Sequence, residues 1–315
     1  MVQQDRNDKK NTVCGIVAAF NFDEHAMRNA ILISSLVDYL IIVDDGSHDV
    51  SKLEQLRGMR LKNVDIVISK ENLGIANSLN VGAKLALSMG YEWCITFDQD
   101  STPDSEMVSL LLRKRDALIE IYGEKVAIVA PNIINQNACS KACKYLIEEK
   151  KFTFSRKEPN EISDDDKVLV VITSGALTNL DVLHKLGFFI TDLFIDYVDT
   201  EYCMRLIVND YKIGIAKDAI LTHNLGDKKL KTILGVDFVA TNHSAFRRYY
   251  IARNSIYMYR KYAKKVPSWF VFDLIATFYN SVRIILCEKD ILNKAKFCFS
   301  GYRDGILGKM GKING

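Results

Sequence analysis

Two aspartates with the spacing of a metal site, Asp98 and Asp100, follow a short apolar run from Trp93 to Phe97. Carboxylates at positions i and i+2, placed where a strand becomes a loop, can face one hard cation. Mg²⁺ and Mn²⁺ prefer oxygen ligands and commonly bridge carboxylates to phosphate oxygens. Aspartates at a strand end are also typical of an ordinary turn. The pattern therefore indicates either a metal–diphosphate site or a turn.

Further acidic and amide groups follow other apolar runs of the chain. The run Asp44-Asp45-Gly46-Ser47 comes after one of them, and Asn21, Asn72 and Gly74 come after two more. A later segment, Asp196 to Glu201, holds three acids and leads into a helical pattern. Core packing does not require such clustering, so these groups are candidates for chemistry.

The elements that would position these groups alternate between strands and helices. We expect strands at Val13 to Phe20, Leu40 to Val43, Val64 to Ser69, Trp93 to Phe97 and Val126 to Ala130, and helices at Glu24 to Val37, Val50 to Gly58, Ile75 to Met89 and Ser105 to Tyr122. Gly90 and Gly123 stand where helix C-caps are expected. This alternation predicts an α/β fold with a parallel sheet covered on both faces. Ligands of such sheets bind beyond the carboxyl ends of the strands, where the polar groups gather.

The regular alternation ends after Pro131. The polar segment from Asn132 to Lys167 predicts loops and a surface hairpin. We expect the later elements to be a strand at Val168 to Thr173, a short helix at Asp181 to Leu186 that ends at Gly187, a helix after Asp196, and a strand from Lys212 to Leu221 leading to His223.

In order and spacing, these motifs resemble those of the family 2 glycosyltransferases, which have the GT-A nucleotide-diphospho-sugar-binding fold. The likeness covers about Thr12 to Gly226 and includes the strand ending at Asn21, the Asp-Asp-Gly-Ser run, the Asn-x-Gly element, the Asp-x-Asp and the later acidic group. Three segments resemble the bacterial rhamnosyltransferase branch more narrowly: Ser174-Gly175-Ala176, His223-Asn224-Leu225-Gly226 and Tyr249 to Asn254. The resemblance implies a GT-A domain, for which we expect residues 12–245, and a helical C-terminal extension, for which we expect residues 246–315.

The same resemblance implies a pocket for the nucleotide-sugar donor. It assigns donor binding to Ala18, Asn21, Asp45, Asn72, Gly74, Asp98 and Gly175. Asp45 would pair with the imino N–H of a pyrimidine base, a charge-assisted hydrogen bond that suits thymine and uracil equally. The alternative is a turn that caps the next helix, with Asp44 and Ser47 in the structural role.

A divalent cation, Mg²⁺ or Mn²⁺, is implied as the cofactor. Asp100 would be the direct ligand, with Asp98 nearer the ribose and the metal-bound waters. Some GT-A enzymes also place a histidine on the metal, which here would be His223. The alternative for His223 is an ordinary loop histidine.

The general base would come from the acidic segment. Inverting transfer needs one carboxylate to take the proton of the acceptor hydroxyl. The family pattern maps this role onto Asp199. Val198 stands where the family commonly has Glu, which leaves Asp196 and Glu201 as competing candidates. Asp199 and Glu201 would also favour a helix N-terminus whatever they catalyse, and Asp196 would have a structural role.

The formal net charge of +3 averages two unlike parts of the chain. Residues 246–315 carry 14 Lys or Arg against 4 Asp or Glu, whereas the rest of the chain has a net charge of −7. Five tyrosines lie among the seven basic residues between Phe246 and Lys265, a composition typical of a helix at a membrane surface. The alternative is a helical subdomain packed on the sheet. We expect no nucleic-acid partner, because no nucleic-acid-binding module is recognisable.

Other features of the chain favour the cytoplasm. The N-terminus from Met1 to Asn11 is polar, unlike a signal peptide, and the odd count of seven cysteines suggests reduced thiols. The apolar stretch from Trp269 to Cys287 is interrupted by Asp273, Asn280 and Arg283, which makes it too polar for a comfortable transmembrane helix. We expect a cytoplasmic protein bound peripherally to the inner face of the bacterial cytoplasmic membrane.

The resemblance thus implies an inverting, metal-dependent glycosyltransferase of bacterial surface polysaccharide synthesis (O-antigen or capsule). It would move L-rhamnose from dTDP-rhamnose onto a lipid-linked saccharide. Galactofuranose or another hexose from a UDP-sugar donor is a second possibility. A non-catalytic sugar-nucleotide-binding scaffold is a third, against which the intact Asp98, Asp100 and Asp199 argue. The sequence does not specify the oligomeric state.

Overall fold

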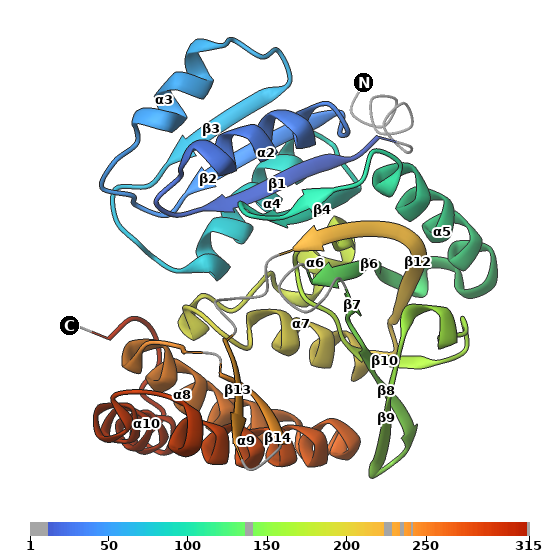
Figure 1. Ribbon diagram of the computed structural model, residues 1–315. Coiled ribbons are helices and arrows are strands. Elements are labelled where there is room, and N and C mark those ends of the chain that lie inside the picture. Colours follow the sequence, from blue (N-terminus) through green and yellow to red (C-terminus); the bar gives the residue numbers. More distant parts are fainter. Residues whose placement is uncertain (1–11, 136–140, 224–228, 234–235, 241, 314–315) are drawn as a thin grey trace.

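The central element of the computed structural model is a mixed sheet with the strand order β3-β2-β1-β4-β11-β6-β12-β5 (Figure 1). The structure describes residues 12–135, 141–223, 229–233, 236–240 and 242–313. The strands are β1 (Cys14–Ala19), β2 (Tyr39–Asp44), β3 (Val64–Ile68), β4 (Trp93–Asp98), β5 (Thr102–Pro103), β6 (Val126–Asn135), β11 (Leu177–Asn179) and β12 (Lys212–His223), with β7 (Lys141–Ala142) paired to β6. β1 to β4 run parallel, and so do β6 and β12, whereas β11 is antiparallel to both β4 and β6.

Helices cover both faces of this sheet because its strands are apolar on both sides. On β1, Ile16 points to one core cluster and Val17 to the other. The first cluster includes α4 (Ile75–Ser88), α6 (Leu180–Leu186) and α7 (Val198–Ile207), and the second includes α2 (Glu24–Ser34), α3 (Ser51–Gly58) and α5 (Met107–Tyr122). The carboxyl ends of β1, β2 and β4 therefore share one edge between the two helical layers.

A second group of elements lies beneath the sheet and α7 in Figure 1. It contains the small sheet of β8 (Tyr145–Lys150), β9 (Thr153–Lys157) and β10 (Lys167–Val170), the hairpin of β13 (Lys229–Ile233) and β14 (Val236–Ala240), and three helices. The helices are α8 (Ala245–Tyr262), α9 (Pro267–Cys287) and α10 (Ile291–Ile306). A third apolar cluster, with Trp269 and Tyr262 at its centre, joins α8 and α9 to α7 and the small sheet.

The elements expected before Pro131 are confirmed to within a few residues at their ends. Gly90 and Gly123 both follow helices and have positive φ angles of 85° and 59°. The expected mostly parallel sheet is confirmed; β11 runs antiparallel to β4 and β6, and the two-residue strands β5 and β7 are also antiparallel to their neighbours. A three-residue strand preceded by the Ser174-Gly175-Ala176 turn carries too little pattern to reveal its direction. β6 also continues five residues beyond its expected end at Ala130.

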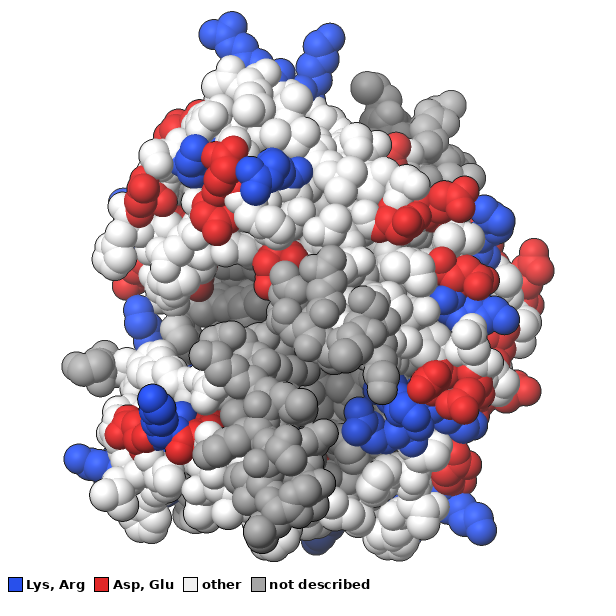
Figure 2. Space-filling view, in the orientation of Figure 1, with Lys and Arg blue, Asp and Glu red and all other residues white. Residues whose placement is uncertain are grey.

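Many of the basic residues expected to form a lipid-binding surface instead form ion pairs or are buried within the protein. Arg248 and Lys294 bind Glu288, and Lys261 binds the buried Glu201. Arg253 is fully buried. On the face shown in Figure 2, the described basic and acidic side chains are interspersed. The alternative of a helical subdomain packed on the rest of the protein therefore accounts for much of this charge.

Helix α9 is the one helix of the described residues that is long and apolar enough to cross a membrane. Its 21 residues have a mean hydropathy of 1.5 in their most apolar window, none of which is buried. By length and composition alone, α9 could therefore cross a membrane. The sequence predicted instead that this stretch is too polar for a comfortable transmembrane helix. The interrupting side chains Asp273, Asn280 and Arg283 all line a cavity on the inner side of the helix.

Candidate active site

A cavity of about 270 Å³ opens at the carboxyl ends of β1, β2 and β4, where the sequence predicts donor binding. Five of the seven expected donor residues line it: Ala18, Asp45, Asn72, Gly74 and Asp98. The other two do not. Asn21 lies exposed in the turn after β1, and Gly175 packs against Pro131 and Leu221. The sequence reasoning missed the remaining wall residues, which are Ala19, Phe20, Ile75, Ser78, Gln99, Phe194 and Ile195.

Asp45 stands at one end of this cavity, almost completely buried. Its two carboxylate oxygens accept hydrogen bonds from the backbone N–H groups of Leu73 and Gly74, at 2.8 and 2.9 Å. Burial raises the pKa of Asp45, while these two donors oppose the shift. The carboxylate therefore holds the Asn-x-Gly loop in place and still faces the cavity.

Close contact between backbone segments explains why glycine stands at positions 46 and 74, in the loops after β2 and β3. Gly46 has a φ of 73°, and a Cβ there would lie 2.3 Å from the backbone carbon of Glu71. Gly74 has a φ of 91°, and its Cβ would lie 2.4 Å from the carbonyl oxygen of Phe194. Only glycine permits both the left-handed conformation and this contact. The donor loops and the Phe194 segment are thereby brought together.

Two polar atoms of the cavity wall are ready for a ligand. Asn72 Oδ1 and Ser78 Oγ are buried, and neither has a hydrogen-bond partner among the described residues. Buried polar atoms are nearly always satisfied, so these two suit the hydroxyl and amide groups of a nucleoside. Ser78 lies on α4, where its position in an apolar helical pattern gave no signal of function.

Asp44 and Ser47 have the structural role that the alternative reading gave them. Asp44 is fully buried and accepts hydrogen bonds from the N–H and the hydroxyl of Ser47. The Ser47 hydroxyl oxygen in turn accepts the N–H of Asn21 at 2.6 Å. The expected cap of the next helix is wrong, because the residue at the N-cap of α3 is Val50.

The expected metal ligands converge at the end of β4. One ligand atom from each of Asp98, Asp100 and His223 can be chosen so that all three lie within 4.8 Å of one another. His223 Nε2 is 3.5 Å from Asp98 Oδ2, and Nδ1 is 3.5 Å from Asp100 Oδ1. Burial, followed by the charge of Asp100, raises the pKa of Asp98, while His223 and Arg247 oppose the shift. Two carboxylates and an imidazole suit Mn²⁺ and also accept Mg²⁺, so these residues fit the implied cation.

The hydroxyl groups of Ser101 and Ser174 form hydrogen bonds with residues of this cluster. Ser101 Oγ lies 2.8 Å from His223 Nδ1 and 2.6 Å from Ser174 Oγ, and the Ser174 hydroxyl accepts the N–H of Asp98. Such a contact to Nδ1 orients the ring and leaves Nε2 for a ligand. Gly175 forms the turn beside Ser174 and donates its N–H to the Thr96 carbonyl. Its role is thus to place the metal ligands rather than to line the cavity.

The three candidate bases, Asp196, Asp199 and Glu201, differ in whether their carboxylates form ion pairs. Asp196 is held by Arg247 in a bidentate ion pair, with Arg247 Nη2 2.9 Å from Asp196 Oδ1. Glu201 is completely buried and binds Arg205 and Lys261. Asp199 forms no ion pair within the described part of the chain, and its carboxylate accepts only from its neighbour Thr200.

The surroundings of Asp199 suit a base. Burial raises its pKa to about 6, assisted by the charges of Asp196 and Asp98 and opposed by the hydrogen bonds from Thr200. A pKa near the working pH favours proton acceptance in a transition state. The influence of Asp98 also places Asp199 close to the expected metal site.

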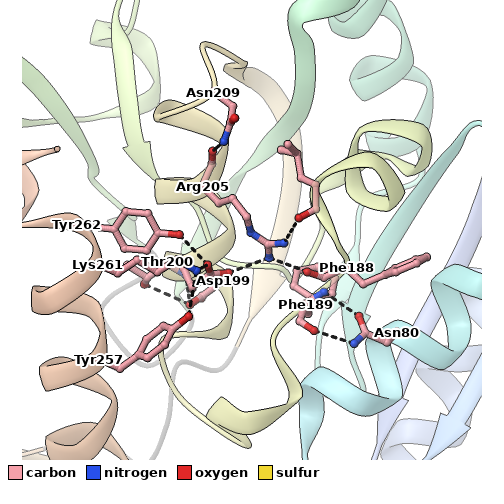
Figure 3. Close-up of polar contacts among 12 residues, drawn as sticks. Asn80, Phe188, Phe189, Asp199, Thr200, Arg205, Asn209, Tyr257, Lys261 and Tyr262 are labelled. Atoms are coloured by element: carbon pink, nitrogen blue, oxygen red, sulfur yellow. Dashed lines mark hydrogen bonds and ion pairs between the residues drawn. The ribbon is translucent and has the colours of Figure 1, made fainter. Parts of the chain in front are cut away.

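Glu201 is the centre of the framework that carries α7, and its partners Arg205, Lys261 and Tyr262 are labelled in Figure 3. Tyr262 and Lys261 of α8 reach one of its oxygens, and Arg205 reaches the other at 2.8 Å. Arg205 also donates to the carbonyls of Leu186 and Phe188. These contacts join α7 to α8 and to the segment after α6. They explain why an acid in the base motif has a structural role.

The loop that precedes Asp199 is held by α8. Asn254 is fully buried, and its amide nitrogen lies 2.9 to 3.0 Å from the carbonyl oxygens of Leu193, Ile195 and Asp196. Arg253 donates to the carbonyls of Asp192 and Leu193. The sequence placed this stretch in a membrane-binding region, but its polar groups face the loop before Asp199. We call residues 192–197 the base loop.

The chain is similar in sequence to known glycosyltransferases. Residues 16–187 match the model of the family described as Glycosyl transferase family 2. The chain is 30% identical over 276 residues to the dTDP-rhamnosyl transferase RfbF of Shigella flexneri, covering 87% of this chain and 88% of that protein. It is 25% identical over 204 residues to the galactofuranosyltransferase GlfT1 of Mycolicibacterium smegmatis, covering 63% of this chain and 65% of that one.

Solved structures share the fold at lower identity. The mannosyltransferase PcManGT of Pyrobaculum calidifontis, solved with GDP-Man and Mn²⁺, matches with a TM-score of 0.57 and 13% identity over 95% of this chain and 88% of its own. TarS of S. aureus matches with a TM-score of 0.53 and 15% identity over 88% of this chain and 44% of its own. Asn224-Leu225-Gly226, part of the narrower resemblance, lies outside the described residues, as does the N-terminus from Met1 to Asn11.

Proposed function

Because the chain belongs to glycosyltransferase family 2, we propose that it transfers L-rhamnose from dTDP-rhamnose to a saccharide acceptor. One observation carries the proposal: a cavity at the strand ends, an Asp-Asp-His cluster and a half-buried carboxylate without an ion-pair partner among the described residues lie close together. The choice of donor is supported by the 30% identity to a protein that bears this activity in its name.

In the proposed reaction, a hydroxyl oxygen of the acceptor attacks the anomeric carbon of the donor sugar. Asp199 takes the proton of that hydroxyl. The bond between the anomeric carbon and the diphosphate oxygen breaks, and the nucleoside diphosphate leaves with the electron pair. Attack from the opposite side inverts the configuration at the anomeric carbon.

The donor pocket would hold the nucleotide through groups already in place. Asp45 would accept the imino N–H of the base, and Asn72 and Ser78 would meet polar atoms of the nucleoside. A divalent cation held by Asp98, Asp100 and His223 would supply positive charge to the diphosphate. Asn21 and Gly175 remain in the proposal as residues that position the β1 turn and the Ser174 hydroxyl.

We further propose that the acceptor is a lipid-linked saccharide and that the enzyme binds peripherally at the inner face of a bacterial cytoplasmic membrane. The support comes from α9, which exposes Leu274, Ile275, Phe278 and Ile285 along one side. A helix with one apolar and one polar face suits the boundary between headgroups and acyl chains. The pathway would be the synthesis of a surface polysaccharide, either O-antigen or capsule.

A second candidate donor is UDP-galactofuranose, favoured by the likeness to GlfT1. The decisive experiment incubates the full chain and Mn²⁺ with dTDP-rhamnose, UDP-galactofuranose or UDP-glucose and measures release of the nucleoside diphosphate by hydrolysis, in which water takes the place of the acceptor hydroxyl. Asp199→Asn serves as the control for catalysis. Release from dTDP-rhamnose that Asp199→Asn abolishes is the expected result. Turnover of only a UDP-sugar would overturn the donor, and binding without turnover by any of the three would favour the scaffold.

A further inference from the structure

A second cavity, of about 140 Å³, lies among α8, α9 and α10, on the inner side of the apolar face of α9. Its polar wall includes Arg248 from α8, His243 just before α8, and Thr277, Asn280, Ser281 and Arg283 from α9. It is smaller than the roughly 300 Å³ expected of a pocket for a whole drug-sized ligand. A small polar group fits this space better than a sugar or a nucleotide.

The wall of this cavity has an excess of positive charge. Outside the wall, the buried Glu288 is shared between Arg248 of the wall at 2.7 Å and Lys294 at 2.8 Å, so one carboxylate serves two cations. Arg283 forms no ion pair among the described residues, and its buried Nε atom has no hydrogen-bond partner there. Burial together with the charges of Arg247 and Arg248 lowers the pKa of His243 to about 4.

The one acid that lines the cavity is already engaged. Asp273 accepts hydrogen bonds from the hydroxyl groups of Tyr197 and Tyr259, at 2.9 and 2.7 Å. Burial raises the pKa of Asp273, while the two hydroxyl donors oppose the shift. Asp273 forms no ion pair with Arg283 among the described residues, and the wall holds two guanidinium groups against this one carboxylate. The unmatched charge fits an anion.

The position of the cavity indicates which anion would reach it. The side chains of α9 that line it lie opposite Leu274 and Phe278, which are exposed by 43% and 73%. If this apolar face sits in a bilayer, the cavity lies at the depth of the headgroups. Tyr197, also in the cavity wall, precedes Asp199 by only two residues. A group bound there is thus near both the membrane surface and the base loop.

We propose that the cavity among α8, α9 and α10 binds the phosphate of the lipid-linked acceptor, with Arg283 and Arg248 as its principal donors. The guanidinium group offers two parallel N–H donors, which match phosphate oxygens. The side-chain amide of Asn280 adds a neutral donor beside it, whereas the Ser281 hydroxyl already donates to the carbonyl of Thr277. The lipid chain would leave along α9, and the saccharide would extend toward Asp199. This inference rests on the proposed function in one respect, the lipid-linked acceptor.

The test compares binding of the full chain to phosphatidylcholine vesicles with and without a polyprenyl diphosphate. Arg283→Gln removes the charge and keeps a shorter polar side chain, Arg283→Lys keeps the charge, and Asn280→Asp puts a repelling carboxylate into the cavity. Lys296→Gln removes an exposed cation of α10 outside the cavity and is the matched control. We expect Arg283→Gln and Asn280→Asp to weaken binding to the diphosphate vesicles about tenfold. Arg283→Lys should retain most of the affinity, and Lys296→Gln should bind like the unaltered chain.

Each other outcome has a definite meaning. Equal weakening by Arg283→Gln and Lys296→Gln would point to general surface charge and overturn the proposal. Unaltered binding by both cavity variants would also overturn it. Inorganic pyrophosphate, measured by calorimetry, separates the sources: Arg283-dependent binding of pyrophosphate without preference for the diphosphate vesicles would refute the lipid assignment. Donor release from dTDP-rhamnose in the absence of acceptor should be equal in all variants, which also shows that they are folded. Its loss in the unaltered chain would count against the donor and leave the vesicle result valid.

Discussion

The hydrogen bonds between Asn254 and the base loop allow the effect of Asn254→Ala on kcat to be predicted. The loop contains three residues other than glycine with positive φ angles, namely Phe194, Asp196 and Tyr197, at 62° to 63°. Such conformations cost about 1–3 kcal/mol each and persist only where neighbouring groups enforce them. Asn254 provides that enforcement through carbonyl contacts to the same loop. We therefore expect Asn254→Ala to release the loop without removing any group that touches substrate.

The magnitude follows from the hydrogen bonds. The side-chain amide has two N–H hydrogens, so at least two loop carbonyls lose a donor. A buried carbonyl left without a hydrogen-bond partner costs about 1–3 kcal/mol of free energy. With two such carbonyls, we expect the ordered conformation of the loop to be destabilised by about 3 kcal/mol. Every 1.4 kcal/mol corresponds to a factor of ten in an equilibrium. Part of this shift is absorbed by the existing stability of the loop, so we expect kcat to fall about 10- to 100-fold.

The assay measures kcat and donor affinity separately. Phe194 and Ile195 line the donor cavity, so the affinity for the nucleotide sugar should also fall, though less than kcat. Ser255→Ala is the matched control, because Ser255 is buried in the same helix and its hydroxyl donates only to the carbonyl of Ala252. It should leave kcat within about twofold. A folded Asn254→Ala variant with unchanged kcat, judged by thermal melting and near-UV circular dichroism, would refute the reasoning.

Three further predictions concern the active site itself. Asp199→Asn should lower kcat by about 10²–10⁴-fold with little change in donor affinity, measured by calorimetry, because only proton acceptance is lost; a drop of less than tenfold would exclude Asp199 as the base. The rate of the unaltered enzyme should fall as the pH drops through about 6, since the raised pKa of Asp199, set by burial and by Asp196 and Asp98, leaves the carboxyl protonated below it; a flat profile of kcat/KM from pH 5 to 8 would contradict this. Chelation by EDTA should abolish turnover, with recovery on adding Mn²⁺, and His223→Ala should raise the Mn²⁺ concentration needed; full activity in EDTA would remove the cation from the proposal.

The donor half of the site was largely predictable because it depends on local sequence. Parallel strands place their carboxyl ends on one edge, so Asp45, Asn72 and Asp98 meet without any long-range information. The glycines Gly46 and Gly74 marked the turns correctly. Asn21 and Gly175 were assigned to the cavity by the resemblance to the family's motifs. Which way a turn residue points depends on packing that a motif does not encode.

The parts that escaped prediction depend on distant contacts. Arg247 meets Asp196 across 51 positions, and Lys312 donates to the carbonyl of Asn72 across 240. No periodicity connects such pairs. A run of Lys, Arg and Tyr has the same composition whether it faces lipid or forms buried hydrogen bonds. The charge of Arg253 therefore suggested a surface, although its side chain is fully enclosed.

The boundary between residues 245 and 246 stays a prediction, and the contacts give it a particular meaning. Helix α8 begins there, and it supplies Asn254 to the base loop and Lys261 to Glu201. The chain after α10 then returns to the donor side, where Gly311 donates its N–H to the carbonyl of Asp192. The region assigned to the membrane is thus also the region that holds the base in place. A helical layer that binds lipid on its outer side and the base loop on its inner side would bring an acceptor at the membrane surface to Asp199 without a separate moving domain.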